Sequence, residues 1–348
     1  MRKIVMLDYL SECDERGKPV GHRIKAGNEY YSFLKDEFKV RVSANEEVLE
    51  FYEAPDRERL GCPPQKNDAG KAKKLKYLKN IREIYRRYPE DVIWFFAPDI
   101  YAYIAMLLFN KGRRKIAVTV CEEHATNRIK HWIFRQALKK ADIVFASNRH
   151  YKKYAQNAVA VPDYTYKPEF YSRYDSEEKK DRVVCLGTMN EKKLLTEAVD
   201  IFNKNGFPLY IAGQFASKER YRQLCEMKAG NITIEDRYID EEEYYRLLGE
   251  SRFSLLPYDE GFYLNRTSGV LQESLFLNTV PIAHRSILDF NGIDGIGYSK
   301  MSDLESFDFH RAGDEGFKKA YEVEKRDFYD QRMVRDKMVG AFTKLMES

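Results

Sequence analysis

The 348-residue sequence lacks any apolar run long enough to cross a bilayer, because its longest, YAYIAMLLF (101–109), falls far short of the roughly 20 residues required. The sequence therefore predicts no transmembrane segment. The apolar stretch at the N-terminus is short and ends at Asp8, so we also expect no signal peptide. Cysteine is scarce: there are five, an odd number, without close metal-ligand spacing. We expect no disulfide and no zinc site, as in a reducing cytoplasm.

Low-complexity tracts and repeats of 20 to 50 residues are also absent, which argues against a disordered chain or a solenoid. Hydrophobic residues make up 43% of the chain and charged residues 33%, a composition typical of a soluble globular protein. A chain of this length exceeds what one hydrophobic core usually serves, so two domains are expected.

The net charge of +4 conceals an uneven distribution. Residues 1–163 carry 32 Lys and Arg against 22 Asp and Glu, whereas residues 164–348 carry 27 against 33. Much of the surplus lies in 71–88, where apolar residues recur at helical spacing and predict an amphipathic helix with a basic face. That face is either an ordinary solvated surface or a surface for anionic lipid or another polyanion, with 110–115 as a second contributor.

Apolar strands alternate with helices along the whole chain. The expected strands are 3–10, 38–44, 91–98, 115–120, 142–147 and 158–162, then, after a polar connector at 163–181, 182–189, 208–214, 231–239, 252–257 and 279–284. Strands that are apolar throughout and separated by helices predict a parallel sheet covered on both faces. The fold class is therefore α/β, with two Rossmann-like halves joined near residue 165.

The stretch PYDEGFYLNRTSGVLQESLFLNTVPIAH (257–284) carries the clearest motif of the second half. It reads as a loop, a helix and a strand directly after the buried strand RFSLLP. In such βαβ units, ligands gather where strand ends meet helix starts. This loop is therefore the first candidate for a binding site.

Together with CLGTMNEKK (185–193), this stretch resembles the donor domain of the GT-B glycosyltransferases. The likeness is to the retaining glycosyltransferase group 1 superfamily of bacterial polysaccharide and lipid enzymes. It covers most of 182–290, whereas the first half matches only in its strand and helix pattern. It implies a GT-B fold, with two Rossmann-like β/α/β domains facing a central cleft. An acceptor domain would span 1–165, a nucleotide-sugar donor domain 166–324, and a C-terminal helix, about 325–348, would pack back on the first domain.

The resemblance and the residue types together suggest how a nucleotide diphosphate sugar would be held. Free N–H groups at Thr267, Ser268 and Gly269 would start a helix and bind the diphosphate. Arg266 would hold phosphate oxygens and stabilise the leaving group. Glu273, eight residues after Asn265 and therefore about two turns along the helix, would accept hydrogen bonds from the ribose.

Gly187, Lys192 and Lys193 match the strand-end glycine and basic pair of the family, with Thr188 where an arginine often follows. The first of the family's two acids is either replaced by Asn265 or supplied by Glu260 after a short insertion. The nucleobase, which could be uracil, guanine or adenine, would meet Gln214, Phe215, Arg237 and Tyr238, where an aromatic or guanidinium face could stack on it. We name Arg266, Lys193, His124 and Glu260 as catalytic candidates.

Metal ligands are not predicted. The Asp-x-Asp pair with which the other major glycosyltransferase fold holds a divalent ion is absent from the chain. Cationic side chains and a helix terminus would do the same electrostatic work. We therefore expect no cofactor beyond the donor substrate, and activity in the presence of a chelator.

The first half is expected to bind the acceptor through Gly21 and His22, in the loop after the first strand. Resembling enzymes often carry a catalytic histidine after the strand that here is KIAVTV; Cys121 stands there, and His124 follows three residues later. His131 lies on the apolar pattern of a helix and is expected to be packed. A retaining enzyme needs no carboxylate nucleophile, whereas an inverting one needs a general base. The carboxylates to test would be Asp8, Glu12, Glu122 and Glu123.

Three functions stay open from the sequence. The leading one is a cytoplasmic hexosyltransferase for a saccharide or polyprenyl-linked acceptor, peripheral at the inner membrane face through 71–88. The second is a GT-B glucosyltransferase acting on DNA, which the basic first half would suit. The third is a non-catalytic nucleotide-sugar binder, suggested by Asn265 and Thr188.

Overall fold

The computed structural model covers residues 1–348 and describes all of them except 1–2, 14–16, 20–22, 62–75, 97 and 124–126. The described chain divides into two compact units. The first comprises Met1–Asp163 together with Arg332–Ser348, and the second Tyr164–Gln331. The chain therefore leaves the first unit after Asp163 and returns to it with its last helix.

The first unit contains a parallel sheet of seven strands in the order β3-β2-β1-β4-β5-β6-β7. The strands are β1 (Ile4–Asp8), β2 (Val40–Ala44), β3 (Arg57–Arg59), β4 (Val92–Phe95), β5 (Lys115–Val120), β6 (Ile143–Ala146) and β7 (Ala158–Ala160). Ile4 of the central strand β1 is in register with Val40 on one side and with Val92 on the other.

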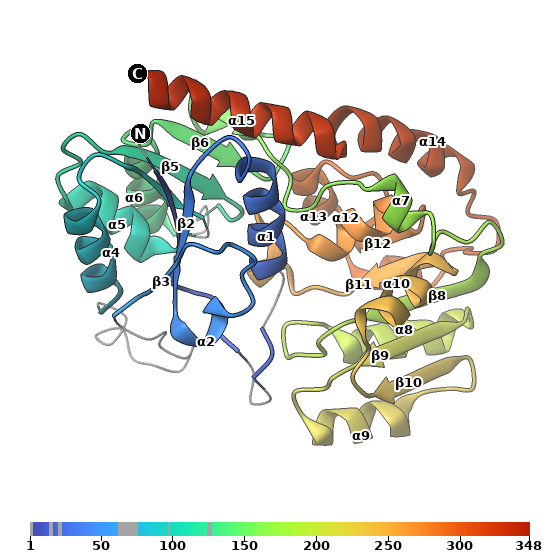
Figure 1. The fold of residues 1–348 in the computed structure, drawn as a ribbon. Coiled ribbons are helices and arrows are strands. Elements are labelled where there is room, and N and C mark those ends of the chain that lie inside the picture. The colour runs from blue at the N-terminus through green and yellow to red at the C-terminus, as the bar shows by residue number, and fades with distance from the viewer. Residues whose placement is uncertain (1–2, 14–16, 20–22, 62–75, 97, 124–126) are drawn as a thin grey trace. The chain divides into compact units, whose positions relative to one another are not determined.

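Helices cover both faces of this sheet, as the apolar strands require. One face packs against α4 (Lys76–Arg87), α5 (Ile100–Leu108) and α6 (Arg128–Leu138). The other packs against α1 (Arg23–Leu34), α2 (Glu46–Leu49) and α15 (Gln331–Glu347). Figure 1 shows α4, α5 and α6 together on one side of the sheet, with α1 on the other. A short 3₁₀ turn, Tyr151–Lys153, precedes β7.

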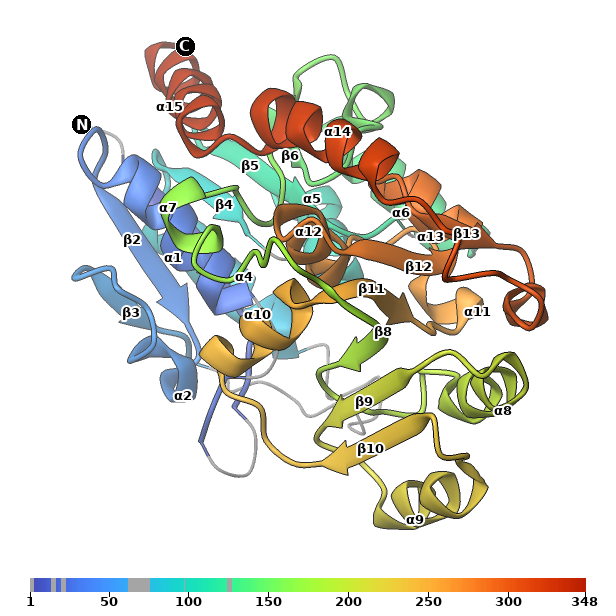
Figure 2. The ribbon, with the colours of Figure 1, turned by 90° about the vertical axis from the view of Figure 1, so that its right-hand side faces the viewer.

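The second unit contains a parallel sheet of six strands in the order β10-β9-β8-β11-β12-β13. The strands are β8 (Lys180–Leu186), β9 (Leu209–Gly213), β10 (Ile232–Asp236), β11 (Ser251–Leu256), β12 (Val280–His284) and β13 (Ile296–Tyr298). Figure 2 shows β8, β9 and β10 side by side. Their carboxyl ends therefore lie at one edge of the sheet.

The helices of this unit follow the strands in alternation. They are α7 (Pro168–Tyr171), α8 (Leu195–Asn205), α9 (Lys218–Met227), α10 (Glu241–Gly249), α11 (Glu260–Tyr263), α12 (Gly269–Phe276), α13 (Arg285–Asn291) and α14 (Glu315–Glu324), with a 3₁₀ turn at Met301–Leu304 and a π-helical turn at Lys325–Tyr329. One apolar cluster joins the sheet to α8 and the 3₁₀ turn. Rings of Tyr171, Tyr245, Phe276 and Tyr329 pack together and join α7, α10 and α12.

The predicted fold class is confirmed: each unit is a Rossmann-like parallel sheet with helices on its faces. The predictions from the sequence missed two edge strands, β3 and β13. Strand β3 reads Arg-Glu-Arg and has no apolar pattern. Its strand conformation comes from backbone pairing with β2, on one side only. Helix α4 is described from Lys76, so residues 71–75 of the predicted basic helix lie outside the described residues. No helix within the described ranges is long and apolar enough to span a membrane.

Candidate functional site

A pocket of about 280 Å³ lies in the second unit, at the carboxyl ends of β8 and β9 and beside the loop after β10. Ligands of open α/β sheets bind at such strand ends. Its lining comprises Gly187, Thr188, Gly213, Gln214, Tyr238, Ile239, Asp240, Glu241 and Tyr244. Of the residues predicted from the sequence to meet the donor, the structure thus brings Gly187, Gln214 and Tyr238 together.

Two glycines, Gly187 and Gly213, line one side of the pocket, and their backbones lie close together. Gly187 has a φ of 95° and Gly213 a φ of 151°. A Cβ atom added at Gly213 would lie 1.8 Å from the carbonyl oxygen of Gly187, which no side chain tolerates. At these two positions the chain therefore presents backbone to the pocket.

Tyr238 contributes the most exposed aromatic ring of the pocket. Its side chain is 52% exposed although it lines the cavity. It lies in the loop between β10 and α10, whose first helical turn begins at the N-cap Asp240. A ring in this position can stack on a nucleobase at its π-face.

Arg237 holds this loop and does not line the pocket. Its guanidinium donates to Glu243 at 2.6 and 2.8 Å, to Glu235 at 2.6 Å and to the Tyr210 hydroxyl at 3.2 Å. Hydrogen bonds from Arg237 lower the pKa of both Glu235 and Glu243. These contacts hold the guanidinium in place beside the loop, and the predicted contact of Arg237 with the nucleobase stays a prediction.

Glu273 lies on α12 and is only 7% exposed. Its Oε2 accepts a hydrogen bond from the Tyr244 hydroxyl at 2.8 Å, and its Oε1 accepts one from the Tyr245 hydroxyl at 2.9 Å. Burial, followed by the charge of Glu273, raises the pKa of Tyr244 and Tyr245, so both hydroxyls stay protonated donors. Because Tyr244 also lines the pocket, Glu273 is linked to the cavity through that hydroxyl.

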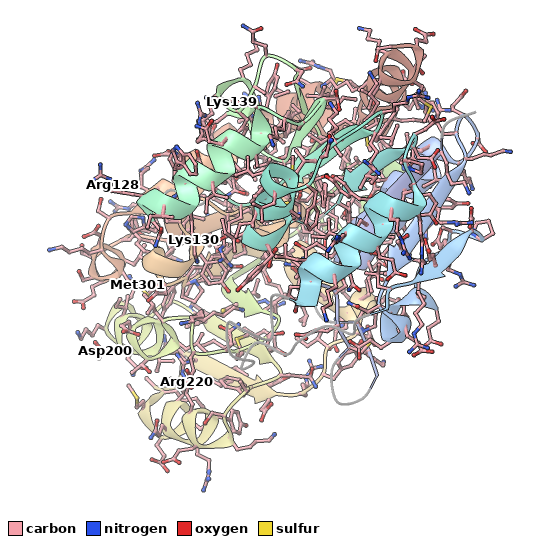
Figure 3. The ribbon with its side chains drawn as sticks, turned by 90° about the vertical axis from the view of Figure 1, so that its left-hand side faces the viewer. Arg128, Lys130, Lys139, Asp200, Arg220 and Met301 are labelled. Atoms are coloured by element: carbon pink, nitrogen blue, oxygen red, sulfur yellow. The ribbon has the colours of Figure 1, made fainter. Side chains whose placement is uncertain are left out.

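The loop after β8 carries the predicted basic pair and lies against the loop after β11. Lys193 pairs with Tyr258 as an isolated bridge, and the backbone N–H of Asp259 donates to the carbonyl of Lys192 at 2.9 Å. Arg220 of α9, labelled in Figure 3, donates to the carbonyls of Asn190 and Lys193 at 2.8 and 2.5 Å. The two loops that the resemblance singled out are thus joined by backbone hydrogen bonds.

The two lysines differ in placement. Lys192 is exposed, whereas Lys193 is 6% exposed and its Nζ donates to the carbonyl of Leu186 at 2.9 Å. Burial lowers the pKa of Lys193. The Lys193 ammonium thus binds the end of β8 from within the unit, and the predicted contacts of Lys192 and Lys193 with the donor diphosphate stay predictions.

The start of α12 differs at Ser268 from the expectation of free N–H groups at Thr267, Ser268 and Gly269. The N–H of Ser268 donates to Oδ1 of Asn291 at 3.0 Å, so it is not available to an anion. Gly269 has a structural reason of its own, because a Cβ there would lie 2.5 Å from the ring of Tyr164, and its predicted contact with the diphosphate stays a prediction. Arg266 and Thr267, both half-buried, precede this turn. The carbonyl of Arg266 accepts from Nδ2 of Asn291 at 3.2 Å.

The two candidates for the first acidic position are placed as follows. Asn265 has a φ of 63°, a left-handed conformation that asparagine adopts more readily than most residues, which gives its identity a structural reason. Glu260 is the first residue of α11, and its side chain lies outside the described residues. The choice between them stays open.

In the first unit, the predicted residues Gly21, His22 and His124 lie outside the described residues. Cys121 follows β5, and its thiol lies 3.4 Å from Oγ of Ser147 and from Oδ1 of Asp163. Burial raises the pKa of this thiol. Asp8 is fully buried and accepts from the Tyr52 hydroxyl at 2.6 Å.

Two further first-unit residues that the sequence singled out, Glu123 and His131, have neighbours. Glu123 pairs with Lys153 at 2.8 Å. His131 packs on Phe134, with ring centroids 6.3 Å apart. Cys13, Cys121, Cys185 and Cys225 form no disulfide with one another.

Replacing Tyr238 with alanine should weaken nucleotide binding by about 1–3 kcal/mol, the range for a base stacked on an aromatic side chain. Calorimetric titration with UDP, GDP and ADP measures it. Met227→Ala, which removes another exposed apolar side chain of this unit, is the control and should leave the affinity unchanged. Equal nucleotide affinity of Tyr238→Ala and wild type would show that the Tyr238 ring does not contact the nucleotide.

No model of a known protein family matches the chain, and no curated protein matches it in sequence. Solved structures do match. HepE of Anabaena, in complex with UDP and glucose, is similar over 99% of this chain and 100% of its own, with a TM-score of 0.66 and 10% identity. Sucrose-phosphate synthase of Thermosynechococcus elongatus is similar over the full length of both chains, with a TM-score of 0.69 and 12% identity. The chain has the GT-B fold.

Enzymes of another reaction class share this GT-B fold with the chain. A UDP-N-acetylglucosamine 2-epimerase matches 99% of this chain and 98% of its own, with a TM-score of 0.56 and 11% identity. At such low identities the likeness establishes the fold, and the reaction has to be argued from the site.

Proposed function

We propose that the protein is a glycosyltransferase that moves a hexose-type sugar from a nucleotide diphosphate sugar to a saccharide or a lipid-linked saccharide. The pocket at the ends of β8 and β9 carries this proposal, because it combines a side-chain-free glycine surface, an exposed ring at Tyr238 and the hydroxyl of Tyr244 bound to Glu273. HepE, which has a similar fold and was solved with UDP and glucose, supports a nucleotide sugar as the ligand.

In this proposal the base stacks on Tyr238 and the diphosphate runs past Gly187 and Gly213, where backbone can approach it closely. Glu273 holds the ribose. Its two oxygens accept the hydroxyls of Tyr244 and Tyr245, and Tyr244 lines the pocket beside it. Lys192 and Arg266 supply the positive charge that stabilises the leaving diphosphate as the glycosidic bond breaks.

We propose a retaining reaction, in which the leaving phosphate accepts the proton of the acceptor hydroxyl on the same face of the sugar. The anomeric configuration of the product, measured by NMR, tests it. An α-linked product from an α-linked donor is the expected result. A β-linked product would show inversion and would direct attention to a general base in the first unit, where Asp8 and Glu123 already have partners.

The likeness to an epimerase gives the second candidate function. A thermal-shift panel of UDP, GDP and ADP sugars identifies the donor, because a ligand that binds only the folded state raises its melting temperature. The donor so identified is then incubated alone and with candidate acceptors. Transfer only in the presence of an acceptor supports the transferase, whereas interconversion of the donor sugar without an acceptor would support the epimerase.

We propose that no metal ion and no cofactor takes part. Lysine and arginine side chains and backbone N–H groups would neutralise the diphosphate in their place. Turnover is expected to continue in EDTA at close to its normal rate. Complete loss of turnover in EDTA, restored by magnesium or manganese, would contradict this part of the proposal.

We further propose that the enzyme lies in the cytoplasm, at the inner membrane face.

A further inference from the structure

An unusual surface lies on the first unit, far along the chain from the residues of the nucleotide pocket. Among the described residues six large apolar side chains are exposed, and three of them lie on α5 and α6: Leu108 at 68%, Ile129 at 72% and Trp132 at 60%. The other three, Met227, Tyr238 and Val323, belong to three different elements of the second unit. Exposed apolar groups that gather in one place mark binding surfaces.

The packing of α6 fixes which residues face outward. Phe134, Ala137 and Leu138 are buried in the apolar core of the first unit. Ile129 and Trp132 are three residues apart and so share one face of the helix, the one that the core leaves exposed. The Nζ of Lys140 donates to the carbonyl of Leu107 at 2.8 Å, which places the end of α5, with Leu108, beside the end of α6.

Basic residues surround these apolar side chains. The segment 127–141 contains five Lys and Arg and no Asp or Glu. Arg128, Lys130 and Lys139 are exposed, and Figure 3 shows Arg128 and Lys139 at the two ends of α6. Lysine is depleted at the centres of protein interfaces. A basic helix with an outward tryptophan is instead typical of proteins that lie on an anionic membrane.

Two other basic segments of this unit lack the apolar component. Helix α4 directs Tyr77, Ile81, Ile84 and Tyr85 into the core, and the exposed positions of its described part carry Lys79, Arg82, Arg86 and Arg87. In 110–115, Lys111 pairs with Asp142 and Arg113 with Glu90. Positive charge on α4 would be attracted to an anionic surface, but it has no exposed apolar group to insert there.

We infer that the outer face of α6, together with the end of α5, binds an anionic membrane surface. Trp132 and Ile129 enter the interfacial region of the bilayer, where indole rings are favoured. Arg128, Lys130 and Lys139 bind lipid phosphates around them. This surface deepens the proposed placement at the inner membrane face, on which it rests, but it needs neither the nucleotide pocket nor a particular acceptor.

The two tryptophans of the chain make the test direct. Trp94 is fully buried and its indole nitrogen donates to Thr119 at 2.9 Å, so a change of emission on adding vesicles reports on Trp132. The full chain is mixed at low salt with vesicles of phosphatidylcholine alone or of phosphatidylcholine with phosphatidylglycerol. A blue shift and flotation are expected with the anionic vesicles and not with the neutral ones. Absence of both would overturn the inference.

Variants assign the binding to α6. The pair Lys130→Gln and Lys139→Gln should weaken vesicle binding roughly 25-fold, since each basic residue near an anionic leaflet contributes about fivefold. Trp132→Ser should weaken it roughly tenfold or more. The matched control, Lys79→Gln with Arg82→Gln on α4, removes the same charge and should weaken binding far less than the α6 pair. A loss as large in the control as in the α6 pair would contradict the assignment.

Two further readouts distinguish membrane binding by this surface from self-association and from nucleotide binding. Light scattering without lipid should give the same mass for wild type and Trp132→Ser. A dimer that this substitution dissociates would make the α6 face a contact between copies and would overturn the inference. Thermal shifts with nucleotides should be unaltered in the α6 variants, so failure of membrane binding and failure of the proposed function are distinguishable.

Discussion

Replacing Glu273 with alanine should reduce donor turnover by at least about 100-fold, the order of loss that a misplaced substrate produces. The same change should lower the free energy of unfolding by about 2–4 kcal/mol, because the hydroxyls of Tyr244 and Tyr245 lose a charged acceptor in a buried place. A transfer assay with the donor, alongside calorimetric nucleotide titration, measures the first effect, and unfolding in urea measures the second.

Substitutions of Tyr244 and Tyr245 distinguish an effect on stability from an effect on nucleotide binding. Tyr245→Phe keeps the ring, which packs among Phe170, Tyr171 and Tyr174, and removes only the hydroxyl that donates to Glu273. Because Tyr245 does not line the pocket, the change should cost stability alone. Tyr244→Phe should cost stability and also weaken nucleotide binding, because Tyr244 lines the pocket. Glu226→Ala, an exposed glutamate on α9, is the control and should change neither quantity. Normal nucleotide affinity in a folded Glu273→Ala protein would remove Glu273 from the site.

Gly213→Ala should be strongly destabilising, costing about 3 kcal/mol or more. The added methyl group would lie 1.8 Å from the Gly187 carbonyl oxygen, and the φ of 151° is already unfavourable for alanine. Separation of β8 from β9 at their ends is the only relief, and it would distort the pocket. Urea unfolding gives the cost, and nucleotide titration gives the loss of binding.

Substitutions of two other glycines serve as controls for the cost of Gly213→Ala. Gly206 ends α8 with a φ of 81° and open space around it, so Gly206→Ala should cost only about 1 kcal/mol for the left-handed backbone. Gly230 has neither a neighbour nor a positive φ, so Gly230→Ala should be neutral or slightly stabilising. A cost for Gly213→Ala no greater than that for Gly206→Ala would show that the two strand ends are not in close contact.

The strands of both sheets could be predicted from the sequence because they are short, apolar and separated by helical periods. Val92–Phe95 and Ile143–Ala146 are buried on both faces and consist of apolar residues, which is the pattern of a parallel sheet. Strand β3 could not be predicted, since Arg57–Arg59 is polar and its strand character comes from its position beside β2. A strand that forms only through such edge pairing has no hydrophobic periodicity by which it could be recognised in the sequence.

The site was predictable where a residue's own chemistry determines its role, and not where a distant partner does. Gly187 and Tyr238 line the pocket as a strand-end glycine and a loop aromatic were expected to. The N–H of Ser268 was expected to be free, but Asn291, 23 residues further on, accepts its hydrogen bond. Tyr244 and Tyr245 were not singled out, because their acceptor is on another helix.

The pocket at the carboxyl ends of β8 and β9 is tested most directly by hydrogen–deuterium exchange with saturating UDP, GDP or ADP. We expect that the nucleotide that raises the melting temperature also slows exchange in 213–215 and 237–244, the segments that carry Gly213, Tyr238 and Tyr244. A nucleotide that stabilises the protein while exchange in both segments stays unchanged would show that nucleotides bind elsewhere.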